Sequence, residues 1–306
     1  MGMGMARLLG SGLIAACVVL ISLDALGAER VRLRHVTSIY FDEKGGSVKN
    51  PEGVACNDAS TLIVADTRNG RLLRYTVDNR TVKPAGEIRA PQVSYPIRVQ
   101  MNSKGDIFSL DGKQRRIARF GAGGEFKGYV SPEGVPSPTD FIPRSLKVDR
   151  NDNLYILDVF SARVLVLGAD GKFQRQLAFP KEYGFFSDLA VDFKGSIFLL
   201  DSVKAMVFVA AKDATTFTAL TQGLRAHLSF PTYLTTDSRG GLYVVDENGA
   251  GVVLLGQDGS FLGRQLAMGW NEGLLYYPSQ MCLNDKGDVF IADRGNSRVQ
   301  VFSVVR

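Results

Sequence analysis

The chain has 306 residues, 45% of them hydrophobic, and a formal net charge of +5. This composition excludes an intrinsically disordered chain, and the length allows one or two domains with a substantial core. Lys and Arg are interspersed with Asp and Glu without a long run of one sign, so the charge permits an anionic partner without requiring one.

Residues 1–28 have the pattern of a secretory signal peptide or another N-terminal membrane-targeting segment. Arg7 precedes an apolar run over residues 8–23, and small residues follow it. The run is shorter than the ~20 residues that a membrane-spanning helix needs. We therefore expect cleavage and export to the periplasm or the medium. Retention as a membrane anchor and lipidation at Cys17 are the alternatives, and only then does the protein contact a membrane.

Residues 29–306 are organised by a repeat and form a single predicted domain. Six stretches carry an aspartate at the end of a short apolar run. Successive aspartates are 43 to 47 residues apart, at Asp66, Asp111, Asp158, Asp201, Asp246 and Asp293. A period in this range is typical of a propeller, a solenoid or a helical array.

Each repeat carries the signals of four strands. A proline stands 15 residues before the aspartate in every repeat except the fourth, which has Phe186. Turns rich in Gly, Asp and Asn divide the remaining sequence into short runs of Val, Ile, Leu, Phe and Tyr, which predicts strands. The second run is apolar at both odd and even positions, so both faces of its sheet must be covered. The sequence therefore predicts an all-β fold, a six-bladed β-propeller of four-stranded antiparallel blades.

The two ends of the repeat region predict how the ring closes. The last repeat stops after its third strand, whereas Val31–Tyr40 precedes the first repeat and belongs to none. We expect this N-terminal strand to complete the last blade.

Two of the stretches, LIVADTRNGRLLRY and VFIADRGNSRVQVF, closely resemble the core pattern of NHL repeats: strand, Asp, small residue, Asn, Arg, strand. The resemblance covers about residues 50–302 and is weaker in the middle, where Met206 and Gly251 replace the recurrent arginine. It implies the propeller fold. It does not select an activity, because members of this family include RNA binders, interaction scaffolds and an amidating lyase.

We interpret the six aspartates as structural. An aspartate that ends a strand can accept hydrogen bonds from the backbone of the following turn. It can also pair with an arginine five residues later, at Arg71, Arg116, Arg163 and Arg298.

The candidate binding side chains gather on one face of the predicted disc. The turns between the second and third strands and the connections into the first strands form this face. Cations interleaved with aromatic residues suit a peptide, a sugar or a polyanion. The candidates are Arg68, Asn69, Arg98, Lys113, Arg115, Arg144, Phe160, Lys204, His227, Tyr233, Glu247, Arg294 and Asn296.

Histidine and cysteine are scarce. His35 lies on the predicted closing strand and is interpreted as structural, which leaves His227 as the one histidine expected on the candidate face. Cys56 and Cys282 are predicted to be buried free thiols, because facing sheets pack roughly 10 Å apart and a disulfide needs Cα atoms within ~7 Å.

These features favour a non-catalytic binding or scaffold module that acts outside the cytoplasm on a protein, peptide or glycan. The sequence has no GxSxG motif and no phosphate-binding glycine loop. The alternative is a metal-dependent hydrolase or lyase, because similar propeller lactonases and esterases bind calcium near the axis. Glu52 and Asp188 are weak metal candidates, and no other cofactor is expected. RNA binding through the basic face is a third hypothesis, against which the predicted export argues.

Overall fold

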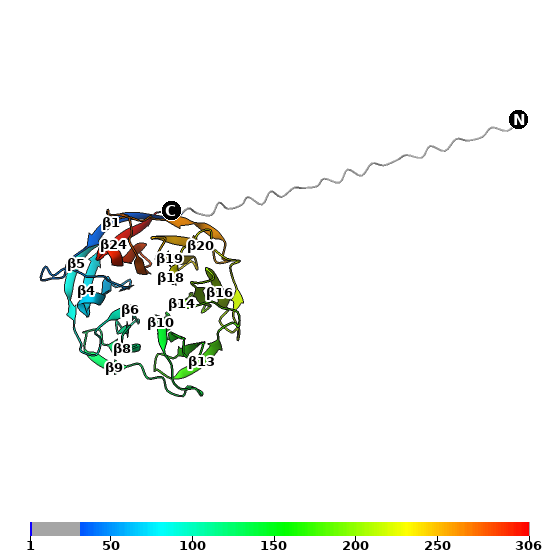
Figure 1. Ribbon diagram of the computed structural model, residues 1–306, viewed down its shortest axis with the longest axis horizontal. Helices are drawn as coiled ribbons and strands as arrows, with labels where there is room; N and C mark the ends of the chain where they lie inside the picture. Colours follow the sequence, from blue (N-terminus) through cyan, green and yellow to red (C-terminus); the bar gives the residue numbers. More distant parts are fainter. Residues whose placement is uncertain (2–30, 306) are drawn as a thin grey trace.

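The computed structural model describes Met1 and residues 31–305, so the rest of the predicted signal segment lies outside the described residues. The described chain forms six four-stranded antiparallel sheets arranged as blades around an axis (Figure 1). This confirms the prediction of a six-bladed propeller. Within the described residues, no helix has the length and hydrophobicity to cross a membrane.

The innermost strand of each blade comes first in its repeat, and the later strands lie progressively outward. From the axis outward, the blades contain β2 (Gly53–Cys56), β3 (Thr61–Asp66), β4 (Arg71–Asp78) and β5 (Thr81–Ile88); β6 (Pro96–Met101), β7 (Ile107–Asp111), β8 (Arg116–Phe120) and β9 (Phe126–Tyr129); β10 (Pro143–Val148), β11 (Leu154–Asp158), β12 (Arg163–Leu167) and β13 (Phe173–Ala178); β14 (Phe186–Val191), β15 (Ile197–Asp201), β16 (Met206–Ala210) and β17 (Thr218–Ala219); β18 (Pro231–Thr236), β19 (Leu242–Asp246), β20 (Gly251–Leu255) and β21 (Phe261–Gln265); and β22 (Pro278–Leu283), β23 (Asp288–Asp293), β24 (Arg298–Val305) and β1 (Arg32–Ile39).

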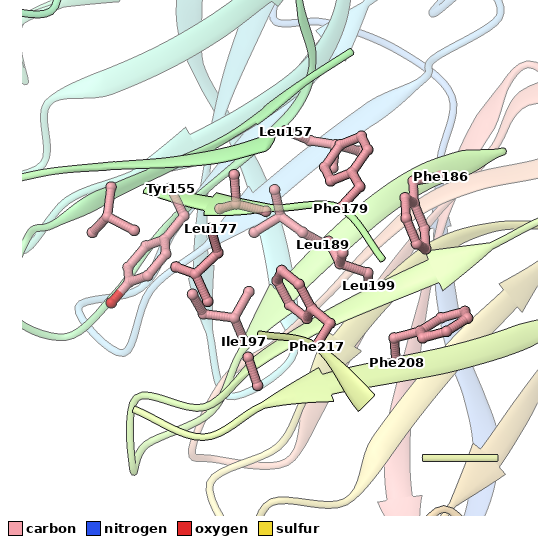
Figure 2. Close-up of a cluster of buried hydrophobic side chains, with 13 residues drawn as sticks. Tyr155, Leu157, Leu177, Phe179, Phe186, Leu189, Ile197, Leu199, Phe208 and Phe217 are labelled. Carbon is pink, nitrogen blue, oxygen red and sulfur yellow. The ribbon is translucent and has the colours of Figure 1, made fainter. Parts of the chain in front are cut away.

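The core consists of separate apolar layers between neighbouring blades. Figure 2 shows one of them, in which Tyr155 and Leu157 of the third blade meet Phe186, Leu189 and Phe208 of the fourth. Each sheet is covered on both faces, which explains why its second strand is apolar at both odd and even positions.

The ring closes as the ends of the repeat region predict. Strand β1 pairs antiparallel with β24, from Arg32 opposite Val305 to Ile39 opposite Val299. His35 lies on this strand, where its ring meets the edge of Phe302 at a centroid distance of 5.6 Å.

The prediction of free thiols is wrong, because Cys56 and Cys282 form a disulfide with a Cα–Cα distance of 5.9 Å. Both residues belong to innermost strands, β2 and β22, of adjacent blades. The 10 Å spacing of packed sheets does not apply there, because blades converge toward the axis.

The repeat aspartates are structural, as predicted, and all except Asp246 tie two loops together. Asp201 illustrates the pattern: it accepts backbone N–H groups from Val203 and Lys204 in the turn after its strand. It also accepts those of Gly184 and Phe185, in the connection that enters the blade. One carboxylate therefore fixes both loops of its blade on the same face of the disc.

The predicted arginine partner is present in three blades. The ion pairs are Asp66–Arg71 at 2.7 Å, Asp158–Arg163 at 2.9 Å and Asp293–Arg298 at 2.8 Å.

Two other blades depart from this pairing. Arg116 lies over the Tyr129 ring, 3.5 Å from its centroid, while Asp111 accepts four backbone N–H groups. In the fifth blade, Arg264 from the outermost strand takes the place of the missing arginine and pairs with Asp246 at 2.9 Å. The aspartate is thus the constant element, and its cation can come from either outer strand.

Candidate active site at the upper mouth of the axis

Polar side chains from the innermost strands cross the axial channel. Arg98 of β6 donates from Nη1 to Ser279 Oγ at 3.1 Å and from Nη2 to the Thr232 carbonyl of β18 at 3.3 Å. Gln280 of β22 accepts from Val99 N at 3.3 Å and donates to its carbonyl at 2.9 Å. The contact with Thr232 links opposite blades, and the other contacts link the two blades that flank the first. They form a polar layer between an upper mouth, at the aspartate ends of the second strands, and a lower mouth at the opposite end.

Asp188 lies in this layer and is fully buried. Its carboxylate accepts hydrogen bonds from the Ser145 hydroxyl and from Leu234 N, the latter at 2.8 Å. The Lys147 ammonium lies 3.7 Å from Asp188 Oδ2. The side chain that the sequence suggested as a metal ligand is therefore already satisfied by donors from two other blades, the third and the fifth.

Glu52 lies at the upper mouth, just before β2. Its backbone is fixed by hydrogen bonds from its N–H to Ala65 O and Thr67 Oγ1, and its Oε1 accepts from the Tyr95 hydroxyl at 3.4 Å. Desolvation raises the pKa of Glu52, although the charges of Arg294 and Arg98 oppose this effect. A carboxylate with a raised pKa is a stronger base than an ordinary glutamate.

Two of the arginines at this mouth are held differently. Arg294 forms an ion pair with Glu247 at 2.5 Å. Arg144 lies with its guanidinium 5.1 Å from the centre of the Phe185 ring and makes no hydrogen bond or ion pair with the described residues. Desolvation, followed by the charge of Arg98, lowers the pKa of Arg144, but a guanidinium stays protonated at neutral pH. Arg144 is thus a cation available to a ligand.

Besides Lys147 Nζ, two buried polar atoms near the axis lack a hydrogen-bond partner among the described residues: Arg98 Nε and Thr232 Oγ1. The two groups are neighbours, because Arg98 donates to the Thr232 carbonyl. Buried donors without a partner are rare and lower stability, so their presence together in a site calls for an explanation. Each group is a donor that a ligand oxygen would satisfy.

We refer to Glu52, Tyr95, Arg98, Arg144, Thr232 and Arg294 as the axial cluster. Of the other predicted candidates, Arg68, Lys113, Arg115 and Phe160 are exposed on the same face. Lys113 lies over the Tyr95 ring, 5.2 Å from its centroid, so this cation borders the cluster.

The remaining candidates are engaged in the fold. The amides of Asn69 and Asn296 donate to the repeat aspartates, and Lys204 donates to the Glu182 carbonyl. Tyr233 is buried in the axial layer, where Gln280 Nε2 lies 3.4 Å from its hydroxyl.

His227 does not lie near the axis. Its ring stacks on Phe261 of the outermost strand β21, with the centroids 3.7 Å apart.

Sequence reasoning missed Thr232 and did not assign Tyr95 to the candidate set. Small polar residues on an apolar strand resemble core positions, so Thr232 gave no signal by itself. The available signal was a recurring position: the residue directly after the repeat proline, or after Phe186 in the fourth repeat, is polar in five of the six repeats, as Glu52, Arg144, Ser187, Thr232 and Ser279. A polar column on the innermost strand marks the axis.

The residues present do not fit a divalent metal ion. No group of three or more His, Cys, Asp or Glu side chains in the described part of the chain has the geometry to hold one. Glu52 lies among cations, and Asp188 is satisfied by its own hydrogen bonds. We therefore derive no catalytic step through calcium or another metal.

Comparisons with known proteins agree with this fold. Residues 275–302 match the family model of the NHL repeat, so the propeller carries an NHL repeat in its last blade. A search of curated proteins by sequence finds no significant match.

Three similar solved structures are enzymes. A gluconolactonase from Xanthomonas campestris has a TM-score of 0.65 at 15% identity, over 90% of this chain and 95% of its own. A virginiamycin B lyase from Staphylococcus aureus has a TM-score of 0.60 at 12% identity, over 90% and 99%. The PQQ-bound aldose sugar dehydrogenase from Streptomyces coelicolor has a TM-score of 0.64 at 13% identity, over 91% and 100%.

These similarities correct the expectation of a non-catalytic binding or scaffold module. The solved structures that share this fold over nearly their whole length include a lactonase, a lyase and a dehydrogenase. They favour the enzymatic alternative, while identities of 12 to 15% leave the reaction to be argued from the axial cluster itself.

Proposed function

We propose that this protein is a hydrolase that opens the ester bond of lactones carrying an acidic group, and that the axial cluster is its active site. The observation that carries the proposal is the pair of unpartnered donors, Arg98 Nε and Thr232 Oγ1, in the same mouth as Glu52. Ester hydrolysis requires hydrogen-bond donors that stabilise the oxyanion and a general base that activates water. Unpartnered donors beside a carboxylate with a raised pKa supply both.

The reaction needs only a water molecule and the groups of this chain. Glu52 takes a proton from water as the water oxygen bonds to the lactone carbonyl carbon. The negative charge that forms on the carbonyl oxygen is stabilised by hydrogen bonds from Arg98 Nε and Thr232 Oγ1. The carbon–oxygen bond of the ring then breaks, and the leaving oxygen takes the proton from Glu52. The product is the open hydroxy acid.

The acidic group of the substrate pairs with Arg144, the guanidinium at this mouth without a protein partner. A guanidinium binds a carboxylate through two parallel hydrogen bonds, which fixes orientation as well as charge. Phe185 and Tyr277 are each 38% exposed beside Arg144 and Arg294 and offer flat surfaces to a sugar ring.

The test is hydrolysis of glucaro-1,4-lactone, a sugar lactone with a free carboxylate, followed by proton release at neutral pH. The wild-type protein should hydrolyse it, and Glu52→Gln should lower kcat by about 10²–10⁴-fold, the usual contribution of a general base. His227→Ala, at the rim, serves as the matched control and should keep the wild-type rate. Wild-type activity in Glu52→Gln would remove the carboxylate from the mechanism, and an unsaturated product would show a lyase instead.

We also propose that the protein acts outside the cytoplasm. The signal-like residues 1–28 support this, and so does the Cys56–Cys282 disulfide, since disulfides persist mainly in oxidising compartments. The mass of the protein recovered from its native host should correspond to a chain that begins after Gly27 or Ala28. A full-length mass in the cytoplasmic fraction would contradict export.

A further inference from the structure

A cavity opens at the lower mouth of the axis, on the opposite side of the polar layer from Glu52 and Arg144 of the axial cluster. Its volume is 860 Å³, and all six blades line it with the ends of their innermost strands and the turns that follow. This volume is within the range of roughly 300–1,000 Å³ that small-molecule sites occupy. The proposed hydrolase mechanism makes no use of this cavity.

The wall of the cavity is acidic, in contrast to the upper mouth. Lys147, Arg150 and Lys286 are its basic residues, whereas six carboxylates line it: Asp58, Asp149, Asp152, Asp192, Asp237 and Asp285. Several of these carboxylates cap their own turns with one oxygen. Asp192, for example, accepts from Lys194 N and Ser196 N at Oδ1, and its Oδ2 accepts no hydrogen bond from the described residues. Asp192 Oδ2 and the excess of carboxylates over cations in the lining favour a cationic group.

The floor of the cavity carries the opposite charge. Lys147 lines the cavity, is only 6% exposed, and its ammonium group is buried without a hydrogen-bond partner among the described residues. Its nearest charge is the Asp188 carboxylate at 3.7 Å, which is already satisfied by Ser145 and Leu234, and the Tyr233 ring centroid lies 3.7 Å away. A buried ammonium with three unused N–H donors is unfavourable by itself and would be stabilised by an anionic group in the cavity.

We propose that the lower mouth binds a zwitterion, namely a short peptide or amino acid. Its carboxylate accepts hydrogen bonds from Lys147, and its ammonium group lies among the carboxylates of the wall. A ligand with only a negative charge would be repelled by the carboxylates of the wall. A ligand with only a positive charge would leave Lys147 without a hydrogen-bond acceptor. Only a ligand with both charges complements the floor and the wall.

The test is calorimetric titration of the purified full chain with three matched probes. Triglycine carries both charges, N-acetyl-triglycine lacks the ammonium group, and triglycinamide lacks the carboxylate. Triglycine should bind, and loss of either charge should weaken binding about tenfold or more, as expected for one charged contact. If triglycine does not bind, or if either single-charge probe binds equally well, the inference is wrong.

Two variants assign the charges to their residues. Lys147→Met should weaken triglycine binding and leave triglycinamide unchanged, whereas Asp192→Asn should weaken triglycine and leave N-acetyl-triglycine unchanged. If Lys147→Met fails to fold, as circular dichroism would show, Asp192→Asn with the same probes still decides the question. Glu52→Gln at the upper mouth should bind triglycine like the wild type. A loss of binding there would place the peptide in the axial cluster and overturn the assignment.

Discussion

At the axial cluster, one carboxylate lies among three guanidinium groups that differ in the ion pairs and hydrogen bonds they form with the protein. Arg294 is paired with Glu247, and Arg98 uses its two terminal nitrogens on Ser279 and Thr232. Arg144 alone of the three has no ion pair or hydrogen bond with the described residues. The three arginines therefore have different proposed roles. Arg144 is available to bind the acidic group of the substrate, and Arg98 Nε is available to donate to the developing oxyanion.

The pKa of Glu52 predicts the pH dependence of the reaction. Desolvation raises this pKa above that of an ordinary glutamate, and Glu52 acts as a base only when deprotonated. In a profile between about pH 4 and pH 8, kcat/KM should therefore fall as the pH drops through a value above the usual glutamate range of about 4.3.

Arg294 offers the matched change for this profile. Its charge lowers the pKa of Glu52, so Arg294→Gln should raise that pKa further and move the acidic limb to higher pH. An acidic limb that stays in place in Arg294→Gln, or that lies at the ordinary glutamate value in the wild type, would contradict Glu52 as the base.

The sequence predicted the cations of the site better than the groups that complete it. Arg98, Arg144 and Arg294 could be placed on the correct face from their distance to the repeat proline and aspartate. Thr232 could not, because its importance depends on an unpartnered hydroxyl beside Arg98, from the opposite side of the ring. Asn69 and Asn296 were predicted as binding residues but donate to the repeat aspartates. The sequence does not distinguish a turn asparagine that faces solvent from one that makes this hydrogen bond.

At the scale of strands and turns, the repeat aspartate explains why the loops of the upper face are held in place. Five of the six carboxylates join the turn after their strand to the connection that enters the blade, as Asp201 does with four backbone N–H groups. Within the described residues, Asp246 accepts backbone N–H groups from the connection alone. The arginine partner is more variable, because Arg264 replaces it from another strand in the fifth blade. The sequence pattern predicted the aspartates fully and the arginines only in part.

The Cys56–Cys282 disulfide joins the innermost strands of the first and last blades, while β1 and β24 close the same junction at the outside. Because the crosslink encloses most of the chain, its removal should increase the entropy of the unfolded state. The double variant Cys56→Ser/Cys282→Ser should lose about 2–4 kcal/mol of unfolding free energy in urea titrations.

A reducing agent provides the control for this prediction. It should lower the urea midpoint of the wild type and leave the midpoint of the double variant unchanged. Equal midpoints for both proteins without reductant would show that β1 alone secures the ring. The sequence predicted free thiols from the general spacing of packed sheets. It could not give their distance, which depends on the convergence of the blades at the axis.

At the scale of the whole molecule, six similar blades produce a disc whose two axial mouths differ in charge. The differences reside in the innermost strands and their turns: cations gather at the upper mouth, and carboxylates line the lower cavity. The polar layer of Arg98, Gln280 and Asp188 lies between them. The ring, the blade count and its closure could be predicted from the repeat, because they depend on local patterns. The pairing of side chains across the axis could not, because it joins residues up to 181 positions apart.

The measurement that tests the account most directly is the ratio of kcat/KM for glucaro-1,4-lactone, which carries a carboxylate, to that for glucono-1,4-lactone, which does not. The wild type should prefer the acidic lactone, and Arg144→Gln should lower that preference by about 10- to 100-fold, the loss expected for one charge-assisted contact. Its rate on the neutral lactone should stay near the wild-type value. Equal rates of the wild type on both lactones, or an unchanged preference in Arg144→Gln, would contradict the claim that the upper mouth recognises an acidic substrate.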